Sequence, residues 1–436
     1  MKRNKTYLVI SAVLFGLLLV TVAYELFGNN DPYKFHTGIG DHFSLSSDDS
    51  SVLFSYYLNG SEAIYRADLN GSNVEQITGH TDQRHRSPDH SADGNYILYL
   101  SRNKEGVQTL YVAERMGGNP LKLTNEEHHV IDAVFSPVED RIYYVAMSAS
   151  DLNKAEGESV SGSNIYTVDL LGEHHEQLAT SIQPHINTLV FSKDGEELYY
   201  SVFTGNRDTV YAFSIHDQNE KLADFKHLFP RDTYLASFDV STDKNSVLYT
   251  GISEASLTSN LFKYELYMKD IASEQTTKLT ELDSLVHAPI FFHQSNTVAF
   301  LQDLNWPIKP EMYRFMTLDL ETKALQQLEF ELPESVVKYW FFKTVDRVIN
   351  GWTVASLYVL FITALTLHFH KKQRRTYIPT MTSFGVSIFL FLSSFVVAGM
   401  TNPWYGIGIA MLAGAMFFCT FIVLLFAFIL RKRMKN

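Results

Sequence analysis

The sequence predicts an all-β, six-bladed β-propeller held outside a membrane by α-helical transmembrane segments, one before it and three after it. Three observations indicate this: charged residues are segregated along the 436-residue chain, long apolar runs lie at both ends, and a strand pattern recurs between them. We therefore expect an N-terminal anchor (1–28), a propeller (29–335), an interfacial helix or linker (336–350) and three transmembrane helices (351–436).

The net charge of −12 combines two opposite parts of the chain. Residues 1–24 and 351–436 hold eleven Lys and Arg and no acid, which leaves 25 basic and 48 acidic residues in the middle. Binding to nucleic-acid phosphates requires a basic face, so nucleic acid is not an expected partner. The single cysteine, Cys419, excludes a disulfide framework and any CxxC zinc or redox site.

Four apolar runs, each of roughly 18–27 residues, are long enough to cross ~30 Å of hydrocarbon as a helix. They are Tyr7–Phe27, Trp352–Phe369, Ile378–Met400 and Trp404–Leu430. Lys and Arg cluster at alternate ends of these runs, and the positive-inside bias then puts both termini in the cytoplasm and the middle of the chain outside. We therefore predict a multi-pass protein of the cytoplasmic membrane, with the lipid bilayer as its first partner.

The first apolar run also has features of a signal peptide. The basic start MKRNK precedes it, and Thr21-Val22-Ala23 is a weak small-residue cleavage site. Because the run exceeds the ~7–15 residues of an h-region, we expect an uncleaved anchor. The last three helices place the middle of the chain outside in either case.

The segment before the second apolar run has apolar residues at helical spacing over 336–349, which predicts an interfacial helix. The last three runs contain no acid. Ion transport usually leaves a charged residue inside a transmembrane segment, so an anchor or a partner-binding hairpin is expected rather than a transporter.

The middle of the chain repeats two half-motifs. The first is an apolar pair, a Ser, a polar turn and a β-rich strand, and the second is an aromatic strand followed eleven to thirteen residues later by an apolar residue, as in Tyr65 and Ile77. Asp-Gly and Asn-Gly pairs supply tight hairpin turns. Units of roughly 45–55 residues with four strands are typical of propeller blades. The anchor positions of the six units are Ser46, Ser91, Ser136, Ser192, Ser241 and the degenerate Phe292.

The combination of Ser-x-Asp-Gly, Ile-Tyr-x-x-Asp-Leu and Gln-Leu-Thr resembles the WD40-like repeats of the TolB-type propeller family. Residues 64–69 with 76–78, and 165–170 with 177–179, match this pattern best, whereas the sixth unit lacks the Ser and the Asp. The resemblance implies a binding or scaffold module of the bacterial cell envelope, in a family that also occurs fused to hydrolases. Fold alone does not decide between such functions.

The sequence contains no recognisable hydrolase or nucleotide-binding motif. A Gly-x-Ser-x-Gly elbow is missed by one residue at 157–162, inside a Ser- and Gly-rich insertion, and neither a phosphate-binding glycine loop nor His-Glu-x-x-His occurs. We therefore expect no catalytic residues and no bound cofactor. The expected role is a scaffold that binds a protein, peptide or envelope-polymer ligand and couples it to a membrane partner.

The histidines supply one candidate metal site. His85, His129, His185 and His287 lie five to eight residues before their anchor positions, where segments of a propeller meet at one mouth of the channel. Converging imidazoles bind transition metals, and some propeller lyases that resemble this repeat class hold a metal in this way. The alternative is that these are solvated loop histidines.

Two other functions remain open beside the scaffold. One is a metal-dependent enzyme that acts on a polysaccharide, with a divalent metal held by the channel histidines. The other is a signal-sensing subunit that passes ligand occupancy to a membrane partner through residues 336–349.

Overall fold

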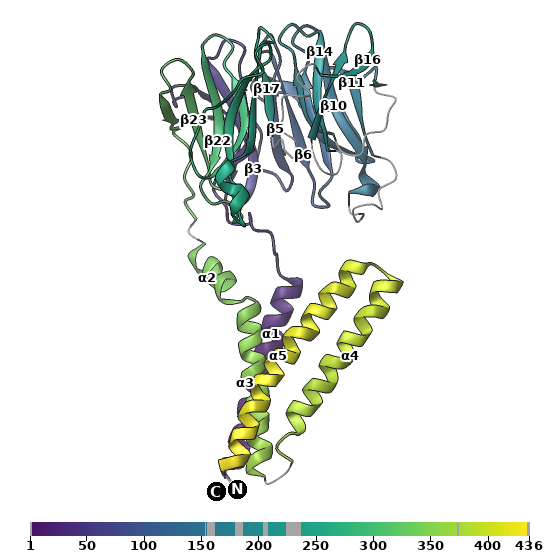
Figure 1. The fold of residues 1–436 in the computed structure, drawn as a ribbon, viewed down its shortest axis with the longest axis vertical. Helices are drawn as coiled ribbons and strands as arrows, with labels where there is room; N and C mark the ends of the chain where they lie inside the picture. Colours follow the sequence, from purple (N-terminus) through teal and green to yellow (C-terminus); the bar gives the residue numbers. More distant parts are fainter. Residues whose placement is uncertain are drawn as a thin grey trace. The chain divides into compact units, whose positions relative to one another are not determined.

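The computed structural model describes residues 2–152, 154, 162–178, 186–203, 208–223, 237–337, 339–372 and 375–433. The chain forms two compact units, a sheet unit of Pro32–Val337 and a helical unit that combines Met1–Asp31 with Lys338–Asn436 (Figure 1). Strands thus occupy the middle of the chain and apolar helices its two ends, as the sequence predicts.

The sheet unit is built from antiparallel sets of four consecutive strands, six among the described residues. The first set is β1 (Gly38–Leu45), β2 (Ser51–Leu58), β3 (Ser61–Asp68) and β4 (Glu75–Gln76). The second is β5 (Arg84–His90), β6 (Tyr96–Arg102), β7 (Gln108–Glu114) and β8 (Leu121–Lys122). The third is β9 (His128–Phe135), β10 (Arg141–Ser148), β11 (Ser163–Asp169) and β12 (Glu176–Gln177).

The remaining sets follow the same order. The fourth is β13 (Ile186–Phe191), β14 (Glu197–Phe203), β15 (Asp208–Ser214) and β16 (Asn219–Leu222). The fifth is β17 (Phe238–Val240), β18 (Ser246–Ile252), β19 (Tyr264–Asp270) and β20 (Thr276–Lys278). The sixth is β21 (Leu285–Phe291), β22 (Thr297–Asp303), β23 (Tyr313–Asp319) and β24 (Leu325–Leu328). A parallel contact between Tyr264 and Leu285 joins the last two sets, and the short helices η1 (Ala149–Asp151) and η2 (Glu254–Thr258) lie in loops.

The repeated Ser-x-Asp motif forms the turn between the first two strands of a set. The Ser91 hydroxyl donates to Asp93 Oδ1 (2.6 Å) and accepts from the Tyr96 N–H (2.9 Å). Ser192 and Ser241 make the same two contacts in their own sets. The motif is therefore a local turn device, as expected for Ser and Asp side chains that bond to nearby backbone.

The core consists of apolar faces of successive sets packed on one another. Leu98 and Leu110 of the second set pack against Val130 and Tyr144 of the third. Because neighbouring side chains on a strand point to opposite faces, each strand can serve the core on both sides. Stacked tyrosine pairs recur in equivalent strands at Tyr99–Tyr111, Tyr144–Tyr166, Tyr200–Tyr211 and Tyr249–Tyr267.

The helical unit has four helices that are long and apolar enough to cross a membrane, among the residues that the structure describes. They are α1 (Lys2–Phe27), α3 (Gly351–Lys371), α4 (Ile378–Met400) and α5 (Pro403–Arg433), and a short helix α2 (Trp340–Val348) precedes α3. These four coincide with the predicted apolar runs. The Asn350 side chain caps α3 by accepting from the N–H groups of Trp352 (2.9 Å) and Thr353 (3.1 Å).

Candidate functional site

A cavity of about 950 Å³ lies where the first strands of the six sets meet. We call these strands, β1, β5, β9, β13, β17 and β21, the inner strands. Each of them contributes lining residues, for example Ser44, Asp89, Asp132, Thr188, Asp239 and Ile290. One concave site is thus shared by all six repeats, which makes it the main candidate for ligand binding.

The strand directions give the sheet unit two ends. The chain enters the sheet unit just before β1, and β2 runs antiparallel to β1. The β2–β3 turn therefore lies at the same end of the unit as the start of β1. At this near end the Gly60 N–H donates to the His36 carbonyl (2.8 Å), and Ser335, at the other end of the sequence of this unit, donates to the Asn59 side chain. The cavity is lined by the ends of the inner strands and the turns that follow them, so it lies toward the opposite, far end.

Three buried aspartates hold the cavity wall together. Asp89 accepts from the N–H of Phe135 (3.1 Å) in the next inner strand, and Asp132 accepts from Leu189 (2.9 Å) in the same manner. Asp239 accepts from the N–H of an inner-strand residue of the sixth set (2.8 Å). Burial raises the pKa of Asp89 to about 6 and also raises that of Asp132. These carboxylates are structural acceptors and not free ligand groups.

A charged cluster lies beside the cavity in the first half of the inner strands. Asp41 pairs with Arg86 and with His42, whose Nδ1 lies 2.8 Å from Asp41 Oδ1. Burial alone would raise the pKa of Asp41, but His42 and Arg86 hold it well below its usual range. Burial likewise opposes the charge on His42, and Asp41 outweighs it and raises the His42 pKa. This cluster therefore favours the protonated form of His42, whose imidazole is one of the groups that line the cavity.

Beneath this cluster lies Glu62, a β3 carboxylate that is almost completely buried. Burial raises its pKa, and the nearby Arg86 charge opposes the rise. A Cβ on Gly40 would lie 1.9 Å from Ser55 Oγ and 3.1 Å from Glu62 Oε1, so only glycine fits at that point. The close packing keeps Glu62 away from the cavity.

Imidazoles and one lysine are among the polar groups that line the cavity. Lys193 Nζ lies 3.3 Å from His293 Nε2. Ser44 Oγ lies 3.0 Å from His90 Nδ1, the arrangement of a nucleophile and a base. However, burial lowers the pKa of His90 to about 3, so His90 is a weak base. Ser44 has in the first set the position that Asp89 has in the second, where Asp89 bonds to the next inner strand. We interpret this pair as another link between neighbouring sets.

Two of the predicted metal ligands have other partners. His85 packs on Tyr99, with ring centroids 5.0 Å apart, and burial lowers its pKa to about 4. His129 Nδ1 accepts from the Gln108 N–H (3.2 Å), and burial also lowers its pKa to about 4. Neither residue lines the cavity. Both rings are neutral at physiological pH; His85 packs within its own set, and His129 bonds to the preceding set.

Of the other two predicted ligands, His185 lies outside the described residues. His287 lines the cavity and faces His42, with ring centroids 5.9 Å apart. A metal shared by all four histidines therefore stays a prediction. The lining imidazoles that the sequence pattern did not single out are His42, His90 and His293.

A register shift in the inner strands explains why the histidines that line the cavity differ from those that the sequence pattern singled out. The pairing of inner strands with their neighbours skips between Ile39 and Phe43, between Arg86 and Asp89, and at similar places in β9, β13 and β21. A β-bulge re-aims the side chains around it, so counting back from the anchor Ser does not identify the face on which a histidine lies. The presence of a His or Lys next to an anchor position would have been a better signal.

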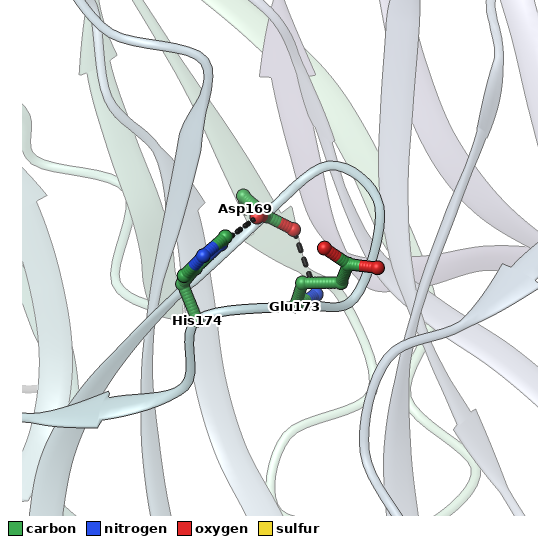
Figure 2. A group of neighbouring side chains, drawn as sticks. All are labelled: Asp169, Glu173 and His174. Atoms are coloured by element: carbon green, nitrogen blue, oxygen red, sulfur yellow. Dashed lines mark hydrogen bonds and ion pairs between the residues drawn. The ribbon is translucent and has the colours of Figure 1, made fainter.

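One group of metal-ligand-type side chains does occur in the described part of the chain: Asp169, Glu173 and His174 (Figure 2). Asp169 Oδ2 lies 2.7 Å from His174 Nδ1, and Asp169 Oδ1 accepts from the Glu173 N–H (2.7 Å). In the first set, Asn73 donates to Asp68 (2.7 Å) across the same five-residue spacing. His174 thus takes the place of a turn-stabilising Asn, and the contacts of the group are those of the turn.

The comparisons with known proteins agree on the fold of the sheet unit. A family model described as the dipeptidyl peptidase IV (DPP IV) N-terminal region matches residues 62–208. TolB from Acinetobacter baumannii is similar in structure, with a TM-score of 0.50 and 15% identity over 66% of this chain and 66% of its own. TolB from Agrobacterium tumefaciens scores 0.43, with 17% identity over 59% and 84% of the two chains.

An oligogalacturonate lyase from Vibrio parahaemolyticus scores 0.47, with 10% identity over 70% of this chain and 82% of that protein. A comparison with curated proteins finds no relative of the sequence. Since the identities are low, these likenesses concern the fold only. The sheet unit is a β-propeller of the TolB-like kind.

Proposed function

We propose that this protein is a membrane-anchored scaffold of the bacterial cell envelope that binds a protein or an envelope-polymer ligand. The sheet unit is a closed propeller of six blades outside the cytoplasmic membrane, and both termini are cytoplasmic. The ligand occupies the cavity between the inner strands. Binding, and not catalysis, is the task of this site.

The observation that carries this proposal is the shared cavity of about 950 Å³, to which every inner strand contributes. Its buried carboxylates Asp89, Asp132 and Asp239 are already committed to the backbone of neighbouring strands. The groups left to meet a ligand are imidazoles, Lys193, hydroxyl and amide side chains, and apolar side chains. Such a mixture suits a polar chain with some apolar residues, and the site lies at the end remote from the connections to the helices.

Closure of the ring is supported by contacts between the first and last sets. Asp49 accepts from the N–H (3.0 Å) and the Nδ1 (3.0 Å) of His293 and from the Gln294 N–H (2.7 Å). Phe315 packs against Phe43 and Phe54, with ring centroids 4.8 and 5.7 Å apart. Each set is contiguous in sequence, so side chains and not an exchanged strand close the ring.

Photo-cross-linking in native membranes tests the binding role. A photoreactive phenylalanine analogue replaces Thr242, which lines the cavity, or Leu171, which is exposed on a far-end turn outside it. We expect a discrete cross-linked product from position 242 that position 171 does not give, and at least a threefold loss of it in the Lys193→Ala background. Identical products at both positions, or no product at position 242, would contradict the proposal.

A further inference from the structure

The loop between β22 and β23 exposes several large apolar side chains. Leu304, Trp306, Ile308 and Met312 are 42, 37, 64 and 53% exposed, and Phe262, in the loop before β19, is 50% exposed. We call these five residues the apolar loop patch. Trp306 Nε1 donates to the Phe262 carbonyl (2.7 Å), which joins the two loops. Contiguous exposed apolar surface of this kind marks an interaction site.

Several polar groups of the loop bond to one another within it. The Asn305 side-chain amide donates to the carbonyls of Ile308 (3.2 Å) and Pro310 (2.8 Å). The buried Asp303 accepts from the N–H groups of Asn305 (2.8 Å) and Met312 (2.9 Å). An irregular segment can enter a low-dielectric medium only when its backbone groups have such partners. These bonds brace the loop that carries the exposed apolar side chains.

The patch lies at the near end of the sheet unit. Loops that follow the second strand of a set share this end, and Tyr33, at the start of the unit, donates to Glu311 in the same loop. Only residues 28–31 separate the end of α1 at Phe27 from Pro32. At ~3.5 Å per residue, that link reaches no further than about 17 Å. The chain itself therefore keeps Pro32, at the start of the sheet unit, within this reach of the end of α1.

We propose that the apolar loop patch inserts into the outer interface of the lipid bilayer and fixes the orientation of the propeller on it. This inference rests on the proposed membrane topology. Trp306 has the amphipathic ring that favours the headgroup level, and Lys309 can extend its ammonium to lipid phosphates. The nearby acid, Glu311, is already bonded to Tyr33. Tethering keeps the patch at a high local concentration of lipid, which favours lipid over a diffusing protein as its occupant.

The test uses the full chain, one copy per nanodisc, with phosphatidylcholine and phosphatidylglycerol as the only lipids. In a Cys419→Ala background, Ile308→Cys carries an environment-sensitive fluorophore, and Leu171→Cys at the far end is the matched exposed control. We expect doxyl-labelled lipid to quench the Ile308 label at least threefold more than the Leu171 label. A Trp306→Glu and Met312→Glu pair should remove most of that difference.

A third label at Phe389→Cys, on the exposed face of α4, separates this inference from the function on which it rests. Quenching at position 389 with equal, weak quenching at 308 and 171 would overturn the insertion and leave the membrane anchor intact. No quenching at 389 would overturn both. The discs contain no other protein. A patch that binds a protein partner instead of lipid would therefore give quenching at 389 with equal, weak quenching at 308 and 171.

Discussion

The aspartate that links two neighbouring strands is the smallest unit that holds this propeller together. Asp89 carries two hydrogen bonds from backbone N–H groups, those of His90 (2.9 Å) and Phe135 (3.1 Å). Burial nevertheless raises its pKa to about 6. The charged carboxylate is therefore tolerated in the fold and not preferred by it, and its contribution to stability depends on pH.

Replacement of Asp89 by Asn tests this dependence. An ordinary Asp has a pKa near 3.9, so the stability linked to the raised pKa is fully present below about pH 4 and is lost as the pH rises through about 6. A neutral Asn side chain does not lose stability in this way as the pH rises. Relative to the wild type, Asp89→Asn should thus gain about 2 kcal/mol between pH 4 and pH 7. Thermal unfolding of the full chain in detergent at several pH values measures the gain.

Asp93 provides the control of opposite sign. The Ser91 hydroxyl and the Asn95 N–H lower its pKa, so its stabilising effect is present above about pH 4 and is lost as the pH falls. Asp93→Asn should therefore lose stability relative to the wild type as the pH rises. Parallel pH profiles for Asp89→Asn and the wild type would show that burial does not shift the Asp89 pKa.

At this scale the sequence predicts only local contacts. The Ser91 and Asp93 turn could be predicted because both partners lie within five residues. The partner of Asp89 is 46 residues away, and it is known only once two sets are packed together. The bulges have the same effect on the histidines: His287 does line the cavity, whereas His85 packs on Tyr99 of its own set.

At the scale of elements, one side chain supplies several of the polar contacts between the first and last sets. Asp49 is nearly buried and accepts three hydrogen bonds from the sixth set, whereas its neighbour Asp48 bonds only within its own turn, to Ser46 and Ser50. The two carboxylates are adjacent in sequence but serve different purposes. This pair offers a clean comparison.

Replacement of Asp49 by Ala should destabilise the propeller by about 3 kcal/mol, because it leaves buried donors unpaired. The apparent melting temperature of the full chain should then fall by roughly 5 °C or more. Asp48→Ala should have less than half of this effect. Equal shifts for the two variants would contradict a role for Asp49 in joining the sets.

Elements were more predictable than contacts between them. The apolar run Ile378–Met400 coincides with α4, because hydrophobicity and length alone specify a membrane helix. The strands followed from aromatic and β-branched residues between Asp-Gly turns. In contrast, the contact of Asp49 with the sixth set could not be predicted. The sixth set lacks the Ser and Asp that mark the other units, so its turn could not be matched to theirs.

At the scale of the whole molecule, the segregated charge implies a topology. Residues 1–24 and 351–436 carry eleven basic residues and no acid, and a net charge of −23 falls on the middle of the chain. Cys419 is buried, so a new exposed cysteine can be labelled selectively in a Cys419→Ala background.

In intact cells, a membrane-impermeant maleimide should label Leu171→Cys, in the propeller, but not Lys372→Cys, in the loop after α3. Both should be labelled after the membrane is permeabilised. The expected difference in intact cells is at least tenfold, because the bilayer excludes the reagent from the cytoplasm. Labelling of position 372 before permeabilisation would show that the orientation is reversed.

The packing of α1 on α3 bears on how the protein is made. Phe15 and Phe361 have ring centroids 5.2 Å apart, and Tyr24 bonds to Asp346, which follows it by 322 residues. At ~5–20 residues per second, translation of that interval takes roughly 16 to 64 s. During this time the first helix exists without the surface it will pack on, while the intervening propeller is synthesised. Biogenesis of this protein therefore requires that a lone helix be retained until its partner is synthesised.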